Sequence, residues 1–171
     1  MPIATVPVKE AILNDIEGID DTGAYAATGL GLLLAAAPFD GDEYYTQVER
    51  IQKIDAGPMD LVEFPAVILA PVTTDYDNFG TQGTTTIAAT YIIQLSLIMR
   101  TRTDAVKEME QFVRDAHKAI LIDRQRNGNA ISTRATSDEV FYPADDEPYT
   151  TANLIIEVEY RTRWNDLNYP T

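Results

Sequence analysis

The sequence contains no cysteine among its 171 residues and only one histidine, His117. The absence of cysteine excludes disulfide bonds and thiolate metal sites, and it is typical of a protein matured in a reducing cytoplasm. A serine-type catalytic triad needs a histidine base, and we expect His117 to lie on the solvent side of a helix. Since a Gly-x-Ser-x-Gly motif is also absent, the sequence argues against a hydrolase of that class.

Basic residues are scarce as well. Lys and Arg number 13 against 27 Asp and Glu, which gives a formal net charge of −14 at pH 7 and a pI near 4.3. Such a charge disfavours binding to a phosphate backbone. The sequence has no run of about 20 apolar residues, and no basic leader followed by an apolar stretch. We therefore expect a chain that is neither membrane-spanning nor exported.

The composition that remains is that of a folded protein. Hydrophobic residues make up 45% of the chain and charged residues 23%, which is the balance found in globular domains. A chain of this length can bury one sizeable core. We predict a single domain over residues 1–171.

Two segments have the period of an amphipathic helix. Apolar residues recur at three- and four-residue steps in 8–19 and, as a longer stripe, in 104–120. The second helix is predicted to end near Asn127-Gly128. A third segment, 23–43, begins with an Ala- and Leu-rich stretch broken by glycines. It predicts either a second buried helix, which we favour, or an insertion or arm that packs on a neighbouring subunit.

Strands are predicted from alternation and from short apolar runs. Residues 91–100 and 153–164 alternate between apolar and polar side chains, and 91–100 is expected to be central to the sheet. Residues 72–90, rich in Thr, Asp, Asn and Gly, predict a long loop or the tip of a projecting hairpin. Shorter strands are predicted at 44–54, which also fits a helix, 64–71, 130–136 and 140–143.

The order of these elements predicts an α+β fold. It would consist of a mainly antiparallel β-sheet with two helices packed on one face, because each amphipathic helix must bury its apolar stripe against the sheet. The polar residues of the alternating strands would then form the opposite face, which is either wet or at an interface.

Two local patterns resemble chemical sites but are incomplete. Residues 75–80 start like a calcium-binding loop, yet Phe79 and Thr86 stand where oxygen ligands are required. Gly29 and Gly31 resemble part of a dinucleotide fingerprint, but Leu34 replaces its third glycine. We predict no catalytic residue, no metal site and no cofactor.

Charged residues cluster near the ends of two predicted strands. If these strands are neighbours, their arginines would form a basic strip on an acidic protein. The arginines either pair with glutamates across the strands or build a charged subunit interface, and the sequence leaves both interpretations open. The candidate interface residues are Arg100, Arg102, Glu157, Glu159, Arg161 and Arg163.

The arrangement of these segments resembles the tail terminator (tail completion) proteins of long-tailed bacteriophages. The resemblance covers most of the chain and rests on five features: Glu10-Ala-Ile-Leu in the first helix, residues 45–53 ahead of Phe64-Pro-Ala-Val-Ile, the strand 91–100, the helix beginning at Asp104, and the closing segment 154–163. It implies a ring, usually of six subunits, at the head-proximal end of the tail tube. Such a ring stops tube polymerisation and joins the tail to the neck.

The resemblance also implies the partners. They are copies of the same chain, the tail tube protein, and a neck, connector or sheath protein, while DNA passes through the lumen without specific binding and no membrane is involved. It implies a location in the tail or neck of the virion after synthesis in the host cytoplasm. A neck or head-completion adaptor is the alternative within this class, and a small ligand-binding domain is an alternative from another class. The candidate tail or neck contact is Asp75, Tyr76, Asp77, Asn78 and Phe79.

Overall fold

The computed structural model describes residues 8–19, 29–34, 44–53, 63–77, 84–98, 102–141, 149–163 and 166–170. Within these ranges the protein has two α-helices and a mixed, mostly antiparallel sheet of six strands, so the α+β prediction is confirmed. In chain order the elements are α1 (Val8–Glu17), the 3₁₀ helix η1 (Leu30–Leu33), β1 (Arg50–Lys53), β2 (Ala66–Asp77), β3 (Thr84–Ile98), α2 (Arg102–Leu121), β4 (Ser132–Phe141), β5 (Tyr149–Arg163) and β6 (Asp166–Pro170).

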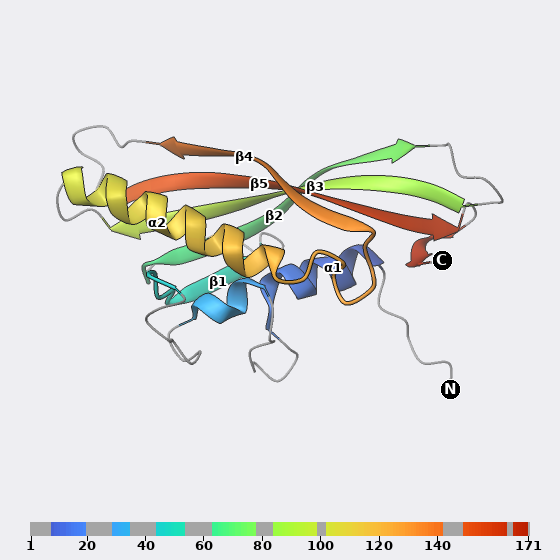
Figure 1. Ribbon diagram of the computed structural model, residues 1–171, viewed down its shortest axis with the longest axis horizontal. Helices are drawn as coiled ribbons and strands as arrows, with labels where there is room; N and C mark the ends of the chain where they lie inside the picture. Colours follow the sequence, from blue (N-terminus) through green and yellow to red (C-terminus); the bar gives the residue numbers. More distant parts are fainter. Residues whose placement is uncertain are drawn as a thin grey trace.

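The strands lie in the order β1-β2-β3-β5-β4. Only the β1–β2 pair is parallel; the other neighbouring pairs are antiparallel. Because β3 pairs with β5 over its full length, β6 must follow β4 along the other edge of β5. Figure 1 shows a strongly twisted sheet, in which β2 lies below β3 and β5 at the left of the view and above them at the right.

The core lies between the helices and one face of β3 and β5. The predicted alternation is confirmed over the described part of both strands, because every second residue is buried there: Ile87, Ala89, Tyr91, Ile93, Leu95 and Leu97 in β3, and Ala152, Leu154, Ile156, Val158 and Tyr160 in β5. The apolar stripe of α2 is buried against this face as predicted. Val8, Ile12 and Ile16 of α1 join the same core.

The long loop predicted at 72–90 is wrong, and the hairpin alternative is correct. β2 continues to Asp77 and β3 already begins at Thr84, so residues 78–83, which lie outside the described ranges, join the two strands. Thr85 is buried between the half-buried Thr84 and Thr86. Threonine is β-branched and favours extended backbone, which explains why a polar segment forms a strand here.

Other element predictions need smaller corrections. The two short strands predicted at 130–136 and 140–143 are one strand, β4, with a bulge between Ala135 and Ser137. The strand predicted at 44–54 is limited to β1, after a single bridge between Leu34 and Val48. α2 ends at Leu121, before the turn that contains Asn127 and Gly128.

The Gly-Leu-Gly pattern has a structural explanation. η1 packs against the end of α1, and Leu30 and Leu33 are fully buried, so this part of the 23–43 segment belongs to the core of its own chain. A Cβ atom on Gly31 would lie 2.1 Å from the carbonyl oxygen of Gly18. Only glycine permits this approach of two backbones.

We expect Gly31→Ala to lower the free energy of unfolding by about 3 kcal/mol, because the new methyl group meets backbone that cannot move independently. Gly128→Ala is the matched control: its φ is +82°, but open space surrounds it, so it should cost about 1 to 2 kcal/mol from backbone strain alone. Urea denaturation of both variants measures the difference. Equal losses would show that the contact between η1 and α1 is not tight.

Candidate assembly surfaces

The face of the sheet opposite the helices is formed by the residues that alternate with the core. We call it the outer face. The register places its residues in rows that cross β2, β3 and β5. Every residue in the three central rows is half-buried or exposed. These rows are Asp75–Ala88–Glu159, Thr73–Thr90–Glu157 and Ala70–Ile92–Ile155.

The predicted interface residues Glu157, Glu159 and Arg161 lie along this outer face on β5. Glu157 binds Arg134 of β4, with Oε1 at 2.5 Å from Nη2 and 2.9 Å from Nε. Sequence reasoning expected cross-strand pairing of Glu157 but missed Arg134 as its partner. The sequence predicts two short strands in place of β4, and short strands do not define a register with β5. The continuous strand β4 sets Arg134 opposite Glu157.

The predicted basic strip is wrong. β3 and β5 are neighbours, but they are antiparallel, so Arg161 pairs with Thr86 while Arg102 follows the other end of β3. Residues 86–98 of an extended strand span about 40 Å. Arg102 therefore lies far from Arg161 and from Arg163, which pairs with Thr84. Arg100 lies outside the described residues.

The predicted contact loop lies partly in a strand. Asp75, Tyr76 and Asp77 end β2, and Asp75 is exposed on the outer face; Asn78 and Phe79 lie outside the described ranges. A calcium loop wraps its ligands around the ion, which extended backbone does not do. In the described part of the chain, no three potential metal ligands lie together.

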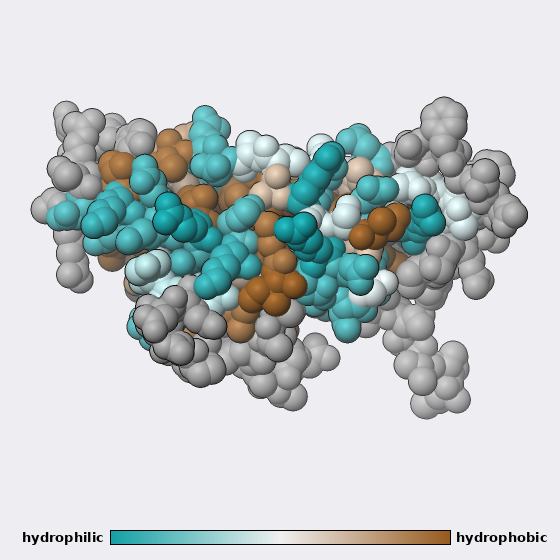
Figure 2. All heavy atoms as spheres, viewed as in Figure 1, coloured by the Kyte–Doolittle hydropathy of each residue, from teal (hydrophilic) through white to brown (hydrophobic). Residues whose placement is uncertain are grey.

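The two ends of the sheet differ in chemistry. At the end where β3 and β4 finish, three large apolar side chains are exposed: Tyr45 by 67%, Ile98 by 54% and Phe141 by 42%. Tyr45 and the neighbouring Leu97 line one small groove there, and Figure 2 shows apolar surface, in brown, at the left end of the view. We call Tyr45, Ile98 and Phe141 the apolar end. The opposite end carries the exposed charges of Asp75 and Arg161, and Ile131, 41% exposed, lies beside Glu159 near them.

Two grooves of about 470 Å³ lie between helices and strands. One runs between α2 and β4 and is lined by Glu110, Arg114, His117 and Asp138 among others. His117 is half-buried in its wall, so its predicted place on the solvent side of the helix is only partly correct. The other groove lies between α1 and the β2–β3 hairpin, and Tyr91 contributes to its lining.

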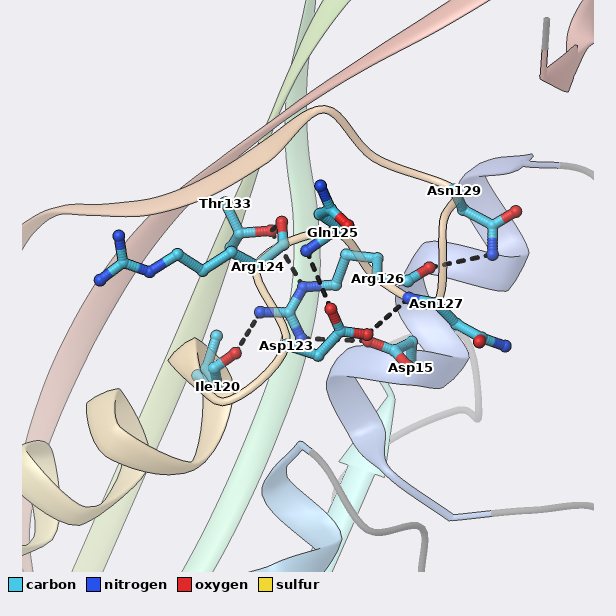
Figure 3. A network of polar contacts seen from close by, with 9 residues as sticks. All are labelled: Asp15, Ile120, Asp123, Arg124, Gln125, Arg126, Asn127, Asn129 and Thr133. Carbon is cyan, nitrogen blue, oxygen red and sulfur yellow. Dashed lines mark hydrogen bonds and ion pairs between the residues drawn. The ribbon is translucent and has the colours of Figure 1, made fainter.

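Arg126 lies in the turn between α2 and β4, and its side chain is fully buried. Its guanidinium contacts three elements (Figure 3). Nη1 lies 3.1 Å from Oδ2 of Asp15 in α1, Nε donates to Oγ1 of Thr133 in β4 at 3.0 Å, and Nη2 donates to the carbonyl of Ile120 in α2. One side chain thus joins α1, α2 and β4. No sequence pattern predicts this role, because arginine in a polar turn is usually solvated.

The turn itself is built to place this side chain. Arg126 and Asn127 have φ angles of 49° and 55°, and Gly128 has 82°. The Asp123 carboxylate accepts the amide of Asn127 at 2.5 Å, and the side chain of Asn129 donates to the carbonyl of Arg126 at 3.0 Å. Left-handed backbone is unfavourable for arginine, so the contacts of its side chain must offset this cost.

Burial lowers the pKa of Arg126 from its ordinary value, and the charge of Asp15 acts in the opposite direction. Because a guanidinium keeps its proton at physiological pH, the site holds a buried positive charge. Such a charge is stable only when it is paired and hydrogen-bonded.

We expect Arg126→Met to lower the free energy of unfolding by about 3 to 5 kcal/mol, because it leaves Asp15 without its buried cation. Arg134→Met is the matched control, since it removes the same side chain from an ion pair whose arginine is 69% exposed. That change should cost about 1 kcal/mol or less. Guanidinium denaturation compares the two, and similar losses would contradict the anchoring role of Arg126.

Burial raises the pKa of Tyr91 from 10.0 to about 12. The folded state therefore holds the phenol proton more tightly, and this contribution to stability is complete below pH 10 and lost as the pH rises toward 12. We expect the free energy of unfolding of the wild type to fall more steeply above pH 10 than that of Tyr91→Phe, by about 1.4 kcal/mol per pH unit. Urea denaturation at several alkaline pH values measures both slopes, and parallel slopes would refute this effect.

Comparison with known proteins found no matching family model and no matching curated protein. Among the helices in the described ranges, none combines the length and the apolar character needed to cross a membrane.

Proposed function

We propose that the chain is a structural subunit of a long-tailed phage particle. It is a tail terminator that assembles with copies of itself, about six, into a ring on the head-proximal end of the tail tube. The ring stops tube polymerisation and joins the tube to the neck or connector, and the chain acts without catalysis or a cofactor. The elements on which the resemblance to tail terminators rests are present as α1, β2, β3, α2 and β5.

The observation that supports this proposal most is the difference between the two ends of the sheet. β3 and β5, of 15 residues each, run from the apolar end to an end where Asp75 and Arg161 expose charges of both signs. A subunit placed between two different partners needs two different surfaces, and exposed apolar patches are typical of protein contacts. The tube and the neck are two such partners. The net charge of −14 also suits a passage for DNA, because acidic walls give phosphates nothing to bind.

A capping assay tests this function. The tail tube protein of the same phage is polymerised with and without the gold-labelled chain, and tubes are measured by negative-stain electron microscopy. We expect shorter tubes with label at one end, because a capped end adds no further subunits. Label along the sides, or tubes of unchanged length, would overturn the terminator function. Binding to the isolated connector with no effect on tubes would favour a neck adaptor instead.

The hairpin end provides a sharper variant. Replacing residues 78–83 by Asn-Gly leaves four residues, Asn-Gly-Thr84-Thr85, between the paired Asp77 and Thr86. Hairpin connections of four residues are common, so the fold should stay intact. If the hairpin contacts the tail or neck, this variant should fold but not cap tubes. Ile122→Ser, at an exposed residue after α2, is the control and should cap normally. Full capping by the shortened variant would exclude the hairpin as the contact.

A further inference from the structure

The solvent side of α2 carries a line of basic residues. Lys107, Arg114 and Lys118 are exposed, and their spacing of seven and four residues places them on one stripe of the helix. This stripe is opposite the buried side that contains Phe112 and Ala116. In Figure 2, hydrophilic side chains cover the surface along which α2 runs. We call Lys107, Arg114 and Lys118 the basic crest.

Two cations of this crest are not neutralised within the described part of the chain. The ammonium group of Lys118 lies 4.9 Å from the centroid of the Tyr44 ring. The ion pairs found among the described residues involve Lys53, Arg126 and Arg134, and neither Lys107 nor Arg114 is among them. The exposed acids of the same helix, Asp104, Glu108 and Glu110, lie to the sides of the crest, so a chain with a net charge of −14 presents a narrow line of positive charge along its longest helix.

A complementary acidic row lies on the outer face of the sheet. Asp75 of β2 and Glu159 of β5 both pair with Ala88 of β3, so they stand in one row two strand spacings apart. That separation is roughly 10 Å, since neighbouring strands lie about 4.8 Å apart. Asp75 is exposed and Glu159 half-buried. We call Asp75 and Glu159 the acidic row.

The spacings of the crest and the row match. Seven residues of α-helix rise about 10.5 Å, so Lys107 and Arg114 are separated by nearly the same distance as the two carboxylates. We propose that the basic crest of one copy binds the acidic row of a second copy, with α2 crossing the strands of the outer face. Small Ala88 between the two acids leaves room for the helix. Glu110 lies beside the crest, and Arg161 lies beside the row. Their charges are opposite to those of the crest and the row, so they can form a further pair across the contact.

The contact joins two different surfaces of the same chain. Repeated from copy to copy, a contact of this kind closes a ring when the rotation between copies divides a full turn. Copies that carry −14 each repel one another at long range, so local complementary charges decide the orientation in which they meet. The inference rests on the proposed function in one respect, which is that the chain assembles with itself.

A double charge swap tests the contact. The crest variant is Lys107→Glu with Arg114→Glu, and the row variant is Asp75→Lys with Glu159→Lys. Self-association of each protein is measured by native mass spectrometry and by sedimentation, in low and high salt. Each variant alone should associate about tenfold more weakly than the wild type or worse, because like charges then face one another. Added salt should weaken the wild-type assembly.

An equal mixture of the two variants should restore assembly. The acidic crest of the crest variant then meets the basic row of the row variant. At the next contact, the unchanged basic crest of the row variant meets the unchanged acidic row of the crest variant. The assemblies should contain both variants in equal numbers. Relative to the wild type, the crest variant is more negative by four charges and the row variant less negative by four, so an effect of net charge alone would move the two in opposite directions.

Two controls complete the design. A mixture of the neutral variants Lys107→Gln with Arg114→Gln and Asp75→Asn with Glu159→Gln restores the original ion pairs at every second contact only, so it should form pairs that contain one copy of each variant but no complete ring. Arg124→Glu reverses an exposed charge in the turn after α2 and should assemble as the wild type does. Circular dichroism and thermal unfolding establish that each variant is folded.

The contact is overturned if either charge-reversed variant assembles like the wild type, if their mixture fails to recover, or if the wild type stays monomeric at every concentration tested. The capping assay decides the proposed function separately. A chain that caps tubes while its charge swaps have no effect is a terminator whose subunits meet through other surfaces.

Discussion

Hydrophobic packing of helices on a sheet has no preferred position along the strands, because apolar contacts are not directional. In this protein the guanidinium of Arg126 fixes the position of both helices along the sheet. It binds α1 through Asp15, the last turn of α2 through Ile120 and the start of β4 through Thr133. Shifting any of these elements by one residue would leave a buried charge with a broken contact, which costs more than a shifted apolar contact.

Polar groups at three places along α2 have different tasks. The helix ends at the Arg126 site. In its middle, the buried Asp115 accepts the amides of Tyr45 and Thr46 at 2.8 and 2.7 Å and so holds the segment that leads into β1. The basic crest makes no ion pair with the described part of the chain through Lys107 or Arg114. The first two places contribute to stability within one subunit. The crest, exposed on the same helix as Glu108 and Glu110, is the group that the proposed contact between copies uses.

Sequence reasoning succeeded where burial imposes a strict period. The alternation in β3 and β5 and the stripe of α2 were predictable because one side of each element must face the core. It failed where the polarity of a segment and its backbone conformation suggest different structures. Residues 84–90 are polar enough to suggest a loop, yet Thr85, Ile87 and Ala89 alternate inward. The bulge in β4 interrupts the alternation, so one strand was predicted as two. The register that places Arg134 opposite Glu157 was missed for the same reason.

The candidate surfaces depended on topology that no local pattern contains. Arginines at the ends of two strands form one strip only if the strands run in the same direction, and the antiparallel pairing of β3 with β5 separates Arg102 from Arg161. The same pairing brings Asp75 and Glu159 together, although one ends the second strand and the other lies in the fifth. Neither the separation of the arginines nor the row of Asp75 and Glu159 can be predicted without the register of the strands.

The acidic charge of the chain bears on when such a ring would form. Exposed ion pairs contribute about 0.2 to 1 kcal/mol each, so the crest and the row fix direction more than strength, while the negative charge of each copy opposes association. A subunit held on a tube end meets its neighbour at a high effective concentration, and each added contact then costs little further loss of freedom. Weak, directional contacts between like-charged subunits therefore favour assembly on a template over assembly in dilute solution. A ring that is needed only at the end of a finished tube would form in this way, after the tube is complete and on its end.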